Sequence, residues 1–403
     1  MTLPMASKNR FSRNQSDGTR RSSFSCDNPD RREIVCGCGV ASFSVLLAGL
    51  LGDASPAKAQ TLALPVPELD ALSIRIVTDS YQFAVAPSRK MDTLSIEHFG
   101  WGISPDYPPG PTLASEFGLS MVVTSSRKGE TRKTLIDFGF TAMALNNNLQ
   151  LLGIQPAEID ALVLSHGHYD HFGGLAGFLR QYKDQLKPKL PFYVGGEDCF
   201  CAREWTAPPV KGNFGVIDRE ALAAAKLSVT AMEQPALVAD HGFISGQIGQ
   251  RSFEKLLSPS AMHVGVTEGS GCYPDRLPES ERGPGSIPDQ FRHEIATSFH
   301  VKGRGLVILT SCSHRGVVNA VRQAQTVSGI EKVHAIIGGF HLAPYPADYV
   351  RQTVAALKEI GPDYIVPLHC SGEPFYEMAK AEMPDKLVRA YTGTQLVFSG
   401  SAS

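Results

Sequence analysis

The segment that most constrains this chain is 166–171, which reads His-Gly-His-Tyr-Asp-His. Side chains alternate along an extended segment, so His166 and His168 fall on the same side and both imidazoles can reach one metal ion. Asp170 and His171 stand where a helical pattern begins, close enough to bind a second metal ion beside the first. Such a density of ligand residues after an apolar run is not explained by a core or surface position. The segment therefore predicts a site for two metal ions.

Four apolar runs of strand type are each followed by a polar turn with a histidine and then by an amphipathic segment. The runs and their histidines are 161–164 with His166, 306–309 with His314, 334–337 with His341, and 364–368 with His369. Strands that alternate with helices favour an α/β fold in which helices cover the sheet, and ligands collect at strand ends in such folds. We therefore expect the four histidines to meet at one site.

Two of the later histidines are candidates for the remaining ligands. Zinc takes at least four donors, and protein side chains usually supply three of them. We expect one set of ligands for each metal ion: His166, His168 and His314 for the first, and Asp170, His171 and His369 for the second. The expected metal is zinc, with manganese or iron as alternatives. A structural role for either later histidine is the competing interpretation.

Other side chains near strand ends are candidates for supporting roles. We expect catalytic roles for Asp170 and for His341, which could contact substrate or shuttle a proton, or simply be hydrogen-bonded at a turn. Cys312 could be a bridging or near-metal thiolate, or a buried unreactive thiol. Asp79 and Asp137 end strands, where a carboxylate can hold a ligand histidine by its second nitrogen or can cap a turn or helix.

The first 59 residues differ from the rest. A basic, polar stretch precedes an apolar one at 34–51, and Ala-Lys-Ala stands at 57–59. This order is typical of an export signal, and Arg31 and Arg32 before the apolar stretch suggest the twin-arginine type. We predict a leader at 1–59, cleaved near Gln60, and a periplasmic or secreted protein without stable membrane insertion. A retained membrane anchor is the alternative.

Residues 60–403 are interpreted as one domain. Before the motif we expect three strands and a helix, at 72–77, 119–123, 134–138 and 142–152. The stretch at about 195–290 breaks the alternation, because it is rich in Gly, Pro and Ser and shows one clear helix, at 218–225. We interpret this stretch as an insertion over the site.

Five cysteines follow the predicted leader: Cys199, Cys201, Cys272, Cys312 and Cys370. An oxidising destination would permit disulfides. Cys199 and Cys201 are too close in sequence to bridge each other easily. Cys272 is then a candidate partner for one of them.

Composition narrows the class of partner. Of 403 residues, 42% are hydrophobic and 19% charged, which is ordinary for a globular protein with a large core. The 38 Lys and Arg against 40 Asp and Glu give a net charge of -2 with no basic stripe, so a nucleic-acid partner is not expected. A small-molecule substrate is expected, and the sequence does not indicate an oligomeric state.

The motif at 166–175, His-Gly-His-Tyr-Asp-His-Phe-Gly-Gly-Leu, resembles the signature of the metallo-β-lactamase superfamily, whose fold is an αββα sandwich. Three further segments look like motifs of one branch, the archaeal dihydropterin ribofuranosylaminobenzene phosphate synthases and their bacterial relatives: 310–316, 337–342 and 367–370. The resemblance covers 72–370 except for much of 195–290, and it implies the two ligand sets given above. Where superfamily hydrolases carry a bridging aspartate, this chain has Cys312.

Hydrolysis is the leading functional hypothesis. A metal-bound hydroxide would attack the carbonyl or phosphorus centre of an ester, lactone, thioester or phosphoester, while His341 or Arg315 contacts the leaving or anionic part. The alternative is a synthase or transferase that uses the metals as Lewis acids on a phosphorylated, pterin-like substrate, and phosphate binding near Arg315 would favour it. A di-iron redox protein and a non-catalytic metal-binding protein are further alternatives; the second is disfavoured because all six predicted ligands are present.

Overall fold

The computed structural model describes residues 65–83, 85–99, 110–206, 208, 211–257, 259–283 and 285–401. The leader predicted at 1–59 lies outside these residues, so its cleavage and the destination of the protein stay predictions. Within the described residues, no helix is long and apolar enough to cross a membrane.

One large sheet combines the first half of the described chain with its last strand. In order across the sheet, its strands are β11 (Ser228–Ala231), β8 (Pro191–Val194), β7 (Ala161–Val163), β6 (Glu130–Ile136), β5 (Ser120–Arg127), β2 (Ala71–Thr78), β21 (Gln395–Ser399), β4 (Leu94–Glu97) and β3 (Arg89–Met91). β6, β7, β8 and β11 are parallel neighbours. Their carboxyl ends therefore lie at one edge, and the histidine motif follows β7 at that edge.

A second sheet carries the later histidines. Its strands in order are β12 (Ala236–Val238), β13 (Gly242–Ile244), β17 (Thr297–Val301), β18 (Gly305–Thr310), β19 (Val333–Gly339) and β20 (Tyr364–Leu368), with β1 (Glu68–Leu69) beside β17. β18, β19 and β20 run parallel. The turns that hold His314, His341 and His369 therefore all leave the same edge of this sheet.

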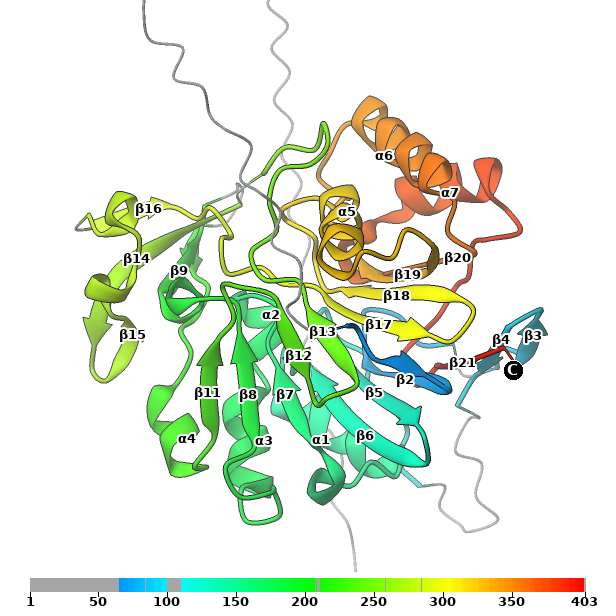
Figure 1. Cartoon of the computed structure of the whole chain (residues 1–403). Coiled ribbons are helices and arrows are strands. Elements are labelled where there is room, and N and C mark those ends of the chain that lie inside the picture. Colours follow the sequence, from blue (N-terminus) through cyan, green and yellow to red (C-terminus); the bar gives the residue numbers. More distant parts are fainter. Residues whose placement is uncertain are drawn as a thin grey trace, which may run out of the picture. The chain divides into compact units, whose positions relative to one another are not determined.

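Three apolar clusters define four layers. One cluster contains residues from both sheets, among them Ile74 and Val123 of the first and Val307 and Ile337 of the second. A second cluster joins the other face of the first sheet to α1, α3 and α4, and a third joins the other face of the second sheet to α5, α6 and α7. The predicted αββα sandwich is confirmed, and Figure 1 shows these helices outside the two sheets.

The helices have the following bounds. The α-helices are α1 (Ala142–Leu151), α2 (Tyr169–Phe172), α3 (Leu175–Tyr182), α4 (Arg219–Ala224), α5 (Val317–Ser328), α6 (Ala347–Ile360) and α7 (Glu373–Glu382). Short 3₁₀ helices are η1 (Pro156–Glu158), η2 (Glu197–Phe200), η3 (Pro274–Arg276), η4 (Glu279–Glu281) and η5 (His369–Ser371).

The elements predicted before the motif are present with small shifts. α1 begins where expected because the Thr141 hydroxyl accepts a hydrogen bond from the Ala144 amide at 3.2 Å. The strand predicted at 134–138 starts earlier and ends at Ile136, because Asp137 has φ 58° and turns the chain out of the sheet.

The stretch predicted as an insertion, 195–290, divides between the sandwich and an added sheet. β11 extends the first sheet, and β12 and β13 extend the second. The added sheet contains β10 (Gly212–Asn213), β9 (Ala202–Trp205), β14 (Ser260–Thr267) and β15 (Ser270–Cys272), with β16 (Gly285–Pro288) beside β14. A disulfide joins Cys201 to Cys272, so Cys201 is the residue that pairs with Cys272, and Cys199 is a free thiol.

Candidate metal centre

The first predicted triad comes together at the carboxyl ends of β7 and β18. His166 and His168 follow β7, His314 follows β18, and all three side chains are buried. Their ring centroids lie 4.9, 4.9 and 4.7 Å apart. One nitrogen from each ring lies within 4.8 Å of the other two, which is a spacing that can hold one metal ion.

Neighbouring hydroxyls orient two of these rings. Nδ1 of His166 lies 3.0 Å from Oγ of Ser165, and Nε2 of His168 lies 2.9 Å from Oγ of Ser260. Nε2 of His166 and both ring nitrogens of His314 have no hydrogen-bond partner among the described residues. Burial, aided by neighbouring imidazoles, lowers the pKa of each ring of the triad well below its usual range. The rings are therefore neutral and able to donate a lone pair.

The second predicted triad also comes together, at α2 and η5. Oδ2 of Asp170 lies 3.2 Å from Nε2 of His369 and 3.8 Å from Nε2 of His171. Oδ1 of Asp170 and Nδ1 of His369 have no hydrogen-bond partner among the described residues. Burial opposes a charge on His369, but Cys370 and the hydrogen bond to Asp170 outweigh it and raise the pKa of His369 to about 9. A metal ion bound here must displace that proton.

Both strand-end aspartates lie beside a ligand candidate. Nδ1 of His171 donates a hydrogen bond to Oδ2 of Asp137 at 2.8 Å, which is the supporting contact predicted for this carboxylate. Asp79 accepts a hydrogen bond from the backbone of His369, and burial raises the pKa of Asp79 to about 6. Asp137 thus orients the ring of His171, whereas Asp79 holds the backbone of His369.

Two thiols lie between the triads. Sγ of Cys312 is 3.2 Å from Nε2 of His171 and 3.3 Å from Sγ of Cys370. Cys312 can share a metal ion with any of three pairs: His166 with His171, His314 with His341, or His369 with Cys370. It therefore stands where one ligand can reach both metal positions. Cys370 is not among the site residues expected from the sequence, although it directly follows His369.

An open cavity of about 760 Å³ adjoins the second triad. Its lining is mostly apolar and includes Tyr81, Phe117, Trp205, Leu257, His341 and His369. The ring of Phe117 lies 4.5 Å from that of His369, centroid to centroid. His341 lies 4.1 Å from His314 by the same measure, and it lines the same cavity. His341 therefore connects the first triad to the cavity and can contact a substrate there.

Arg315, the predicted contact for an anionic group, does not line this cavity. Its Nε donates to the carbonyl of Ile248 at 3.0 Å, and its Nη1 donates to the carbonyl of Gln290 at 2.9 Å. Its backbone amide donates to the carboxylate of Glu294 at 2.7 Å. Through these contacts, Arg315 holds the turn beside His314 in place.

The unpartnered donors of the two triads fit divalent metal ions. Buried nitrogen and carboxylate oxygen atoms without a partner are costly, and coordination to a cation satisfies them. Imidazole, carboxylate and thiolate donors together suit zinc, whereas imidazole and carboxylate alone also suit manganese or iron. The identity and number of the metal ions stay predictions.

Comparison with known proteins agrees with this geometry. The family model of the metallo-β-lactamase superfamily matches residues 115–188, which include the histidine motif. This part of the chain therefore resembles that superfamily, and the chain has the metallo-β-lactamase fold. A solved structure described as a metal-dependent hydrolase of the beta-lactamase superfamily has the same fold, with a TM-score of 0.56 and 21% identity over 80% of this chain and 98% of that one.

Two curated relatives of this chain come from Methanocaldococcus jannaschii. One is named 7,8-dihydropterin-6-methyl-4-(beta-D-ribofuranosyl)-aminobenzene-5'-phosphate synthase and is 28% identical over 286 residues, 70% of this chain and 90% of the relative. The other, an uncharacterised protein, is 25% identical over 282 residues, 69% of this chain and 92% of the relative. The resemblance read from the motifs is confirmed.

Proposed function

We propose that this domain binds two divalent metal ions and acts as a synthase or transferase on a phosphorylated substrate with a flat, pterin-like ring. The observation that carries the proposal is the apolar, aromatic cavity directly beside the second triad. The name of the 28% identical relative supports it, since that name describes a product with a pterin ring, an aminobenzene ring and a phosphate.

The cavity suits a flat aromatic ring better than a charged group. Phe117, Trp205 and Tyr81 offer aromatic faces and edges against which a heteroaromatic ring can pack. The described lining contains no Lys or Arg, so the phosphate end of such a substrate would lie toward the metal positions. Bound divalent ions would polarise and neutralise its oxygens as Lewis acids.

The protein side chains then have separate tasks. His341 stands between the first triad and the cavity, so it can take or give a proton at a bound substrate. Asp170 holds the second metal position together with His171 and His369. The aromatic lining would pack against the faces of the bound ring.

Hydrolysis is the second candidate. It is favoured by the two complete triads, because two adjacent metal positions would suit activation of water and attack on an ester, lactone, thioester or phosphoester. The same cavity would then hold an apolar acyl or aromatic group.

Export through the predicted leader is a separate proposal, which N-terminal sequencing of the purified protein from its native host would test.

One assay separates the two activities. The metal-loaded protein is incubated with phosphorylated reduced pterins and an aminobenzene ribofuranosyl phosphate, and in parallel with ester, lactone, thioester and phosphoester substrates. The expected result is a product that contains both the pterin and the aminobenzene ribofuranosyl phosphate, detected by mass spectrometry and absent with Asp170→Ala. Hydrolysis without any joined product would assign the second candidate instead. Neither activity in metal-loaded protein would contradict both.

A further inference from the structure

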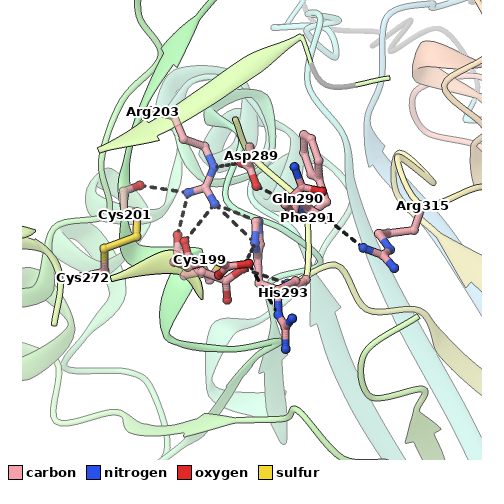
Figure 2. Close-up of polar contacts among 12 residues, drawn as sticks. Cys199, Cys201, Arg203, Cys272, Asp289, Gln290, Phe291, His293 and Arg315 are labelled. Atoms are coloured by element: carbon pink, nitrogen blue, oxygen red, sulfur yellow. Dashed lines mark hydrogen bonds and ion pairs between the residues drawn. A yellow bond between two sulfur atoms is a disulfide. The ribbon is translucent and has the colours of Figure 1, made fainter. Parts of the chain in front are cut away.

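Arg203, in β9, is a buried cation outside the two triads. Its Nε donates to Oδ2 of Asp289 at 2.6 Å, and both side chains have an exposed fraction of 0%. Its Nη1 donates to the carbonyls of Cys199 and Cys201 at 3.1 and 2.9 Å, and its Nη2 donates to the carbonyl of Asp198 at 2.9 Å. Figure 2 shows the guanidinium at the centre of these contacts. The planar fork of arginine is used in several directions at once, which lysine cannot reproduce.

On one side, Arg203 lies against the histidine motif itself. A Cβ placed on Gly167 would lie 2.4 Å from Nη1 of Arg203 and 2.5 Å from the carbonyl oxygen of Cys199. Gly167 is therefore required by the close approach of the guanidinium to the backbone. Because this backbone joins His166 to His168, Arg203 supports the segment that sets the spacing of two triad rings.

On the other side, Arg203 reaches the third ring of the triad through Asp289. Oδ1 of Asp289 accepts a hydrogen bond from the backbone amide of Phe291 at 2.9 Å. Phe291 is fully buried and stacks on His314, with centroids 3.9 Å apart and ring planes at 18°. Its ring also meets His168 edge-on at 4.9 Å. The Arg203–Asp289 pair thus fixes the aromatic ring against which the first triad packs.

We propose that Arg203 is a positioning residue for the first metal position. Its guanidinium packs against the backbone at Gly167, between His166 and His168. Through Asp289, it also holds Phe291 against His314 and His168. Loss of one partner of a buried charge pair leaves the other charge uncompensated, so Arg203 and Asp289 should depend on each other. The inference rests on the proposed function, since it requires that the first triad binds metal.

Two single-site variants, used as backgrounds for the test, each keep one of the two metal positions. Asp170→Ala leaves the first triad intact, and His314→Ala leaves the second. Cobalt(II) is titrated into each in competition with a chelator, and the visible absorption of bound cobalt reports its ligand geometry. With Arg203→Lys, we expect cobalt affinity to fall about tenfold or more in the Asp170→Ala background, with an altered absorption spectrum. In the His314→Ala background, the same substitution should leave affinity and spectrum unchanged.

Arg219→Lys is the matched control. Arg219 stands at the start of α4, pairs with Glu197, and lies 3.9 Å from the Phe200 ring centroid. It is a cation of the same predicted insertion, yet its described contacts do not include Gly167 or Asp289. Its substitution should leave cobalt affinity unchanged in both backgrounds. Asp289→Asn is the second variant, and it should reproduce the loss if Arg203→Lys does not fold.

The outcomes separate this inference from the proposed function. Wild-type protein that binds two cobalt ions, with Arg203→Lys or Asp289→Asn binding as tightly as the parent background, would overturn the positioning role alone. An equal loss in both backgrounds would show general destabilisation and would overturn it too. Wild-type protein that binds no cobalt would overturn the proposed function and this inference together.

Discussion

The carboxylate of Asp137 contacts His171 directly and reaches a ring of the other triad through one hydroxyl. Oδ2 of Asp137 accepts hydrogen bonds from Nδ1 of His171 and from Oγ of Ser165, both at 2.8 Å. Oγ of Ser165 in turn lies 3.0 Å from Nδ1 of His166. Each imidazole then keeps its Nε2 available to a metal ion. One buried carboxylate therefore sets the orientation of a ligand in each triad.

Substitution of this carboxylate should weaken both metal positions. In Asp137→Asn we expect metal affinity to fall about 10- to 100-fold at each position, because the amide no longer fixes the tautomer of His171 or the hydroxyl of Ser165. Ser165→Ala is the comparison, and it should weaken only the first position. Chelator competition measures both. Unchanged affinities in Asp137→Asn would show that the hydrogen bond to His171 is not needed for metal binding.

Cys312 should be visible as a metal ligand in the absorption spectrum. Its Sγ lies 3.2 Å from Nε2 of His171, between the two triads. Cobalt-loaded wild-type protein is expected to show a thiolate-to-cobalt charge-transfer band that Cys312→Ser abolishes. Cys199→Ser is the control, because Cys199 is also buried and free but belongs to none of the described ligand groups. Retention of the band in Cys312→Ser would assign it to another thiol, such as Cys370.

The two metal positions should respond differently to pH. The pKa of His369 is raised to about 9, so below that pH a metal ion at the second triad must displace a proton, and affinity should rise about tenfold per pH unit up to about 9. The pKa of His166, His168 and His314 is lowered well below 6.5, so these rings hold no proton to displace near neutral pH. Chelator competition between pH 7 and 9 in the two single-position backgrounds measures both slopes. Equal slopes would contradict this assignment.

The aromatic lining should determine substrate affinity. Phe117 lies over the cavity beside His369, and its loss should cost about 1 kcal/mol of ring packing, or about fivefold in the Kd for a reduced pterin. Phe253→Ala is the control, since Phe253 is another exposed aromatic residue, packed on Tyr349 rather than in the cavity lining. Calorimetric titration measures both. Wild-type affinity in Phe117→Ala would show that the ring of the substrate does not bind in this cavity.

The grouping of the candidate ligand histidines could be predicted from sequence because their signal is local. His166 and His168 alternate in one extended segment, and His314 and His369 each follow an apolar run that forms a parallel strand. The contact between Asp137 and a histidine of the motif was one of two roles expected from its place at a strand end. Each of these inferences needed only a few neighbouring residues.

Local sequence patterns could not identify the supporting residues that lie in the predicted insertion. Arg203 and Asp289 meet across 86 positions of sequence, and neither stands in a periodic pattern or a ligand motif. β21 enters the first sheet between β2 and β4, which requires a pairing between the two ends of the domain. Such contacts depend on the register of the assembled sheets, which no short segment of sequence determines.

Metal analysis of the purified protein tests the central claim most directly. The two triads predict two equivalents of divalent metal in the wild-type protein, and one in Asp170→Ala and in His314→Ala. Elemental analysis after loading with zinc, manganese or iron, followed by dialysis, gives these numbers. Folded wild-type protein that retains none of the three metals would contradict the account.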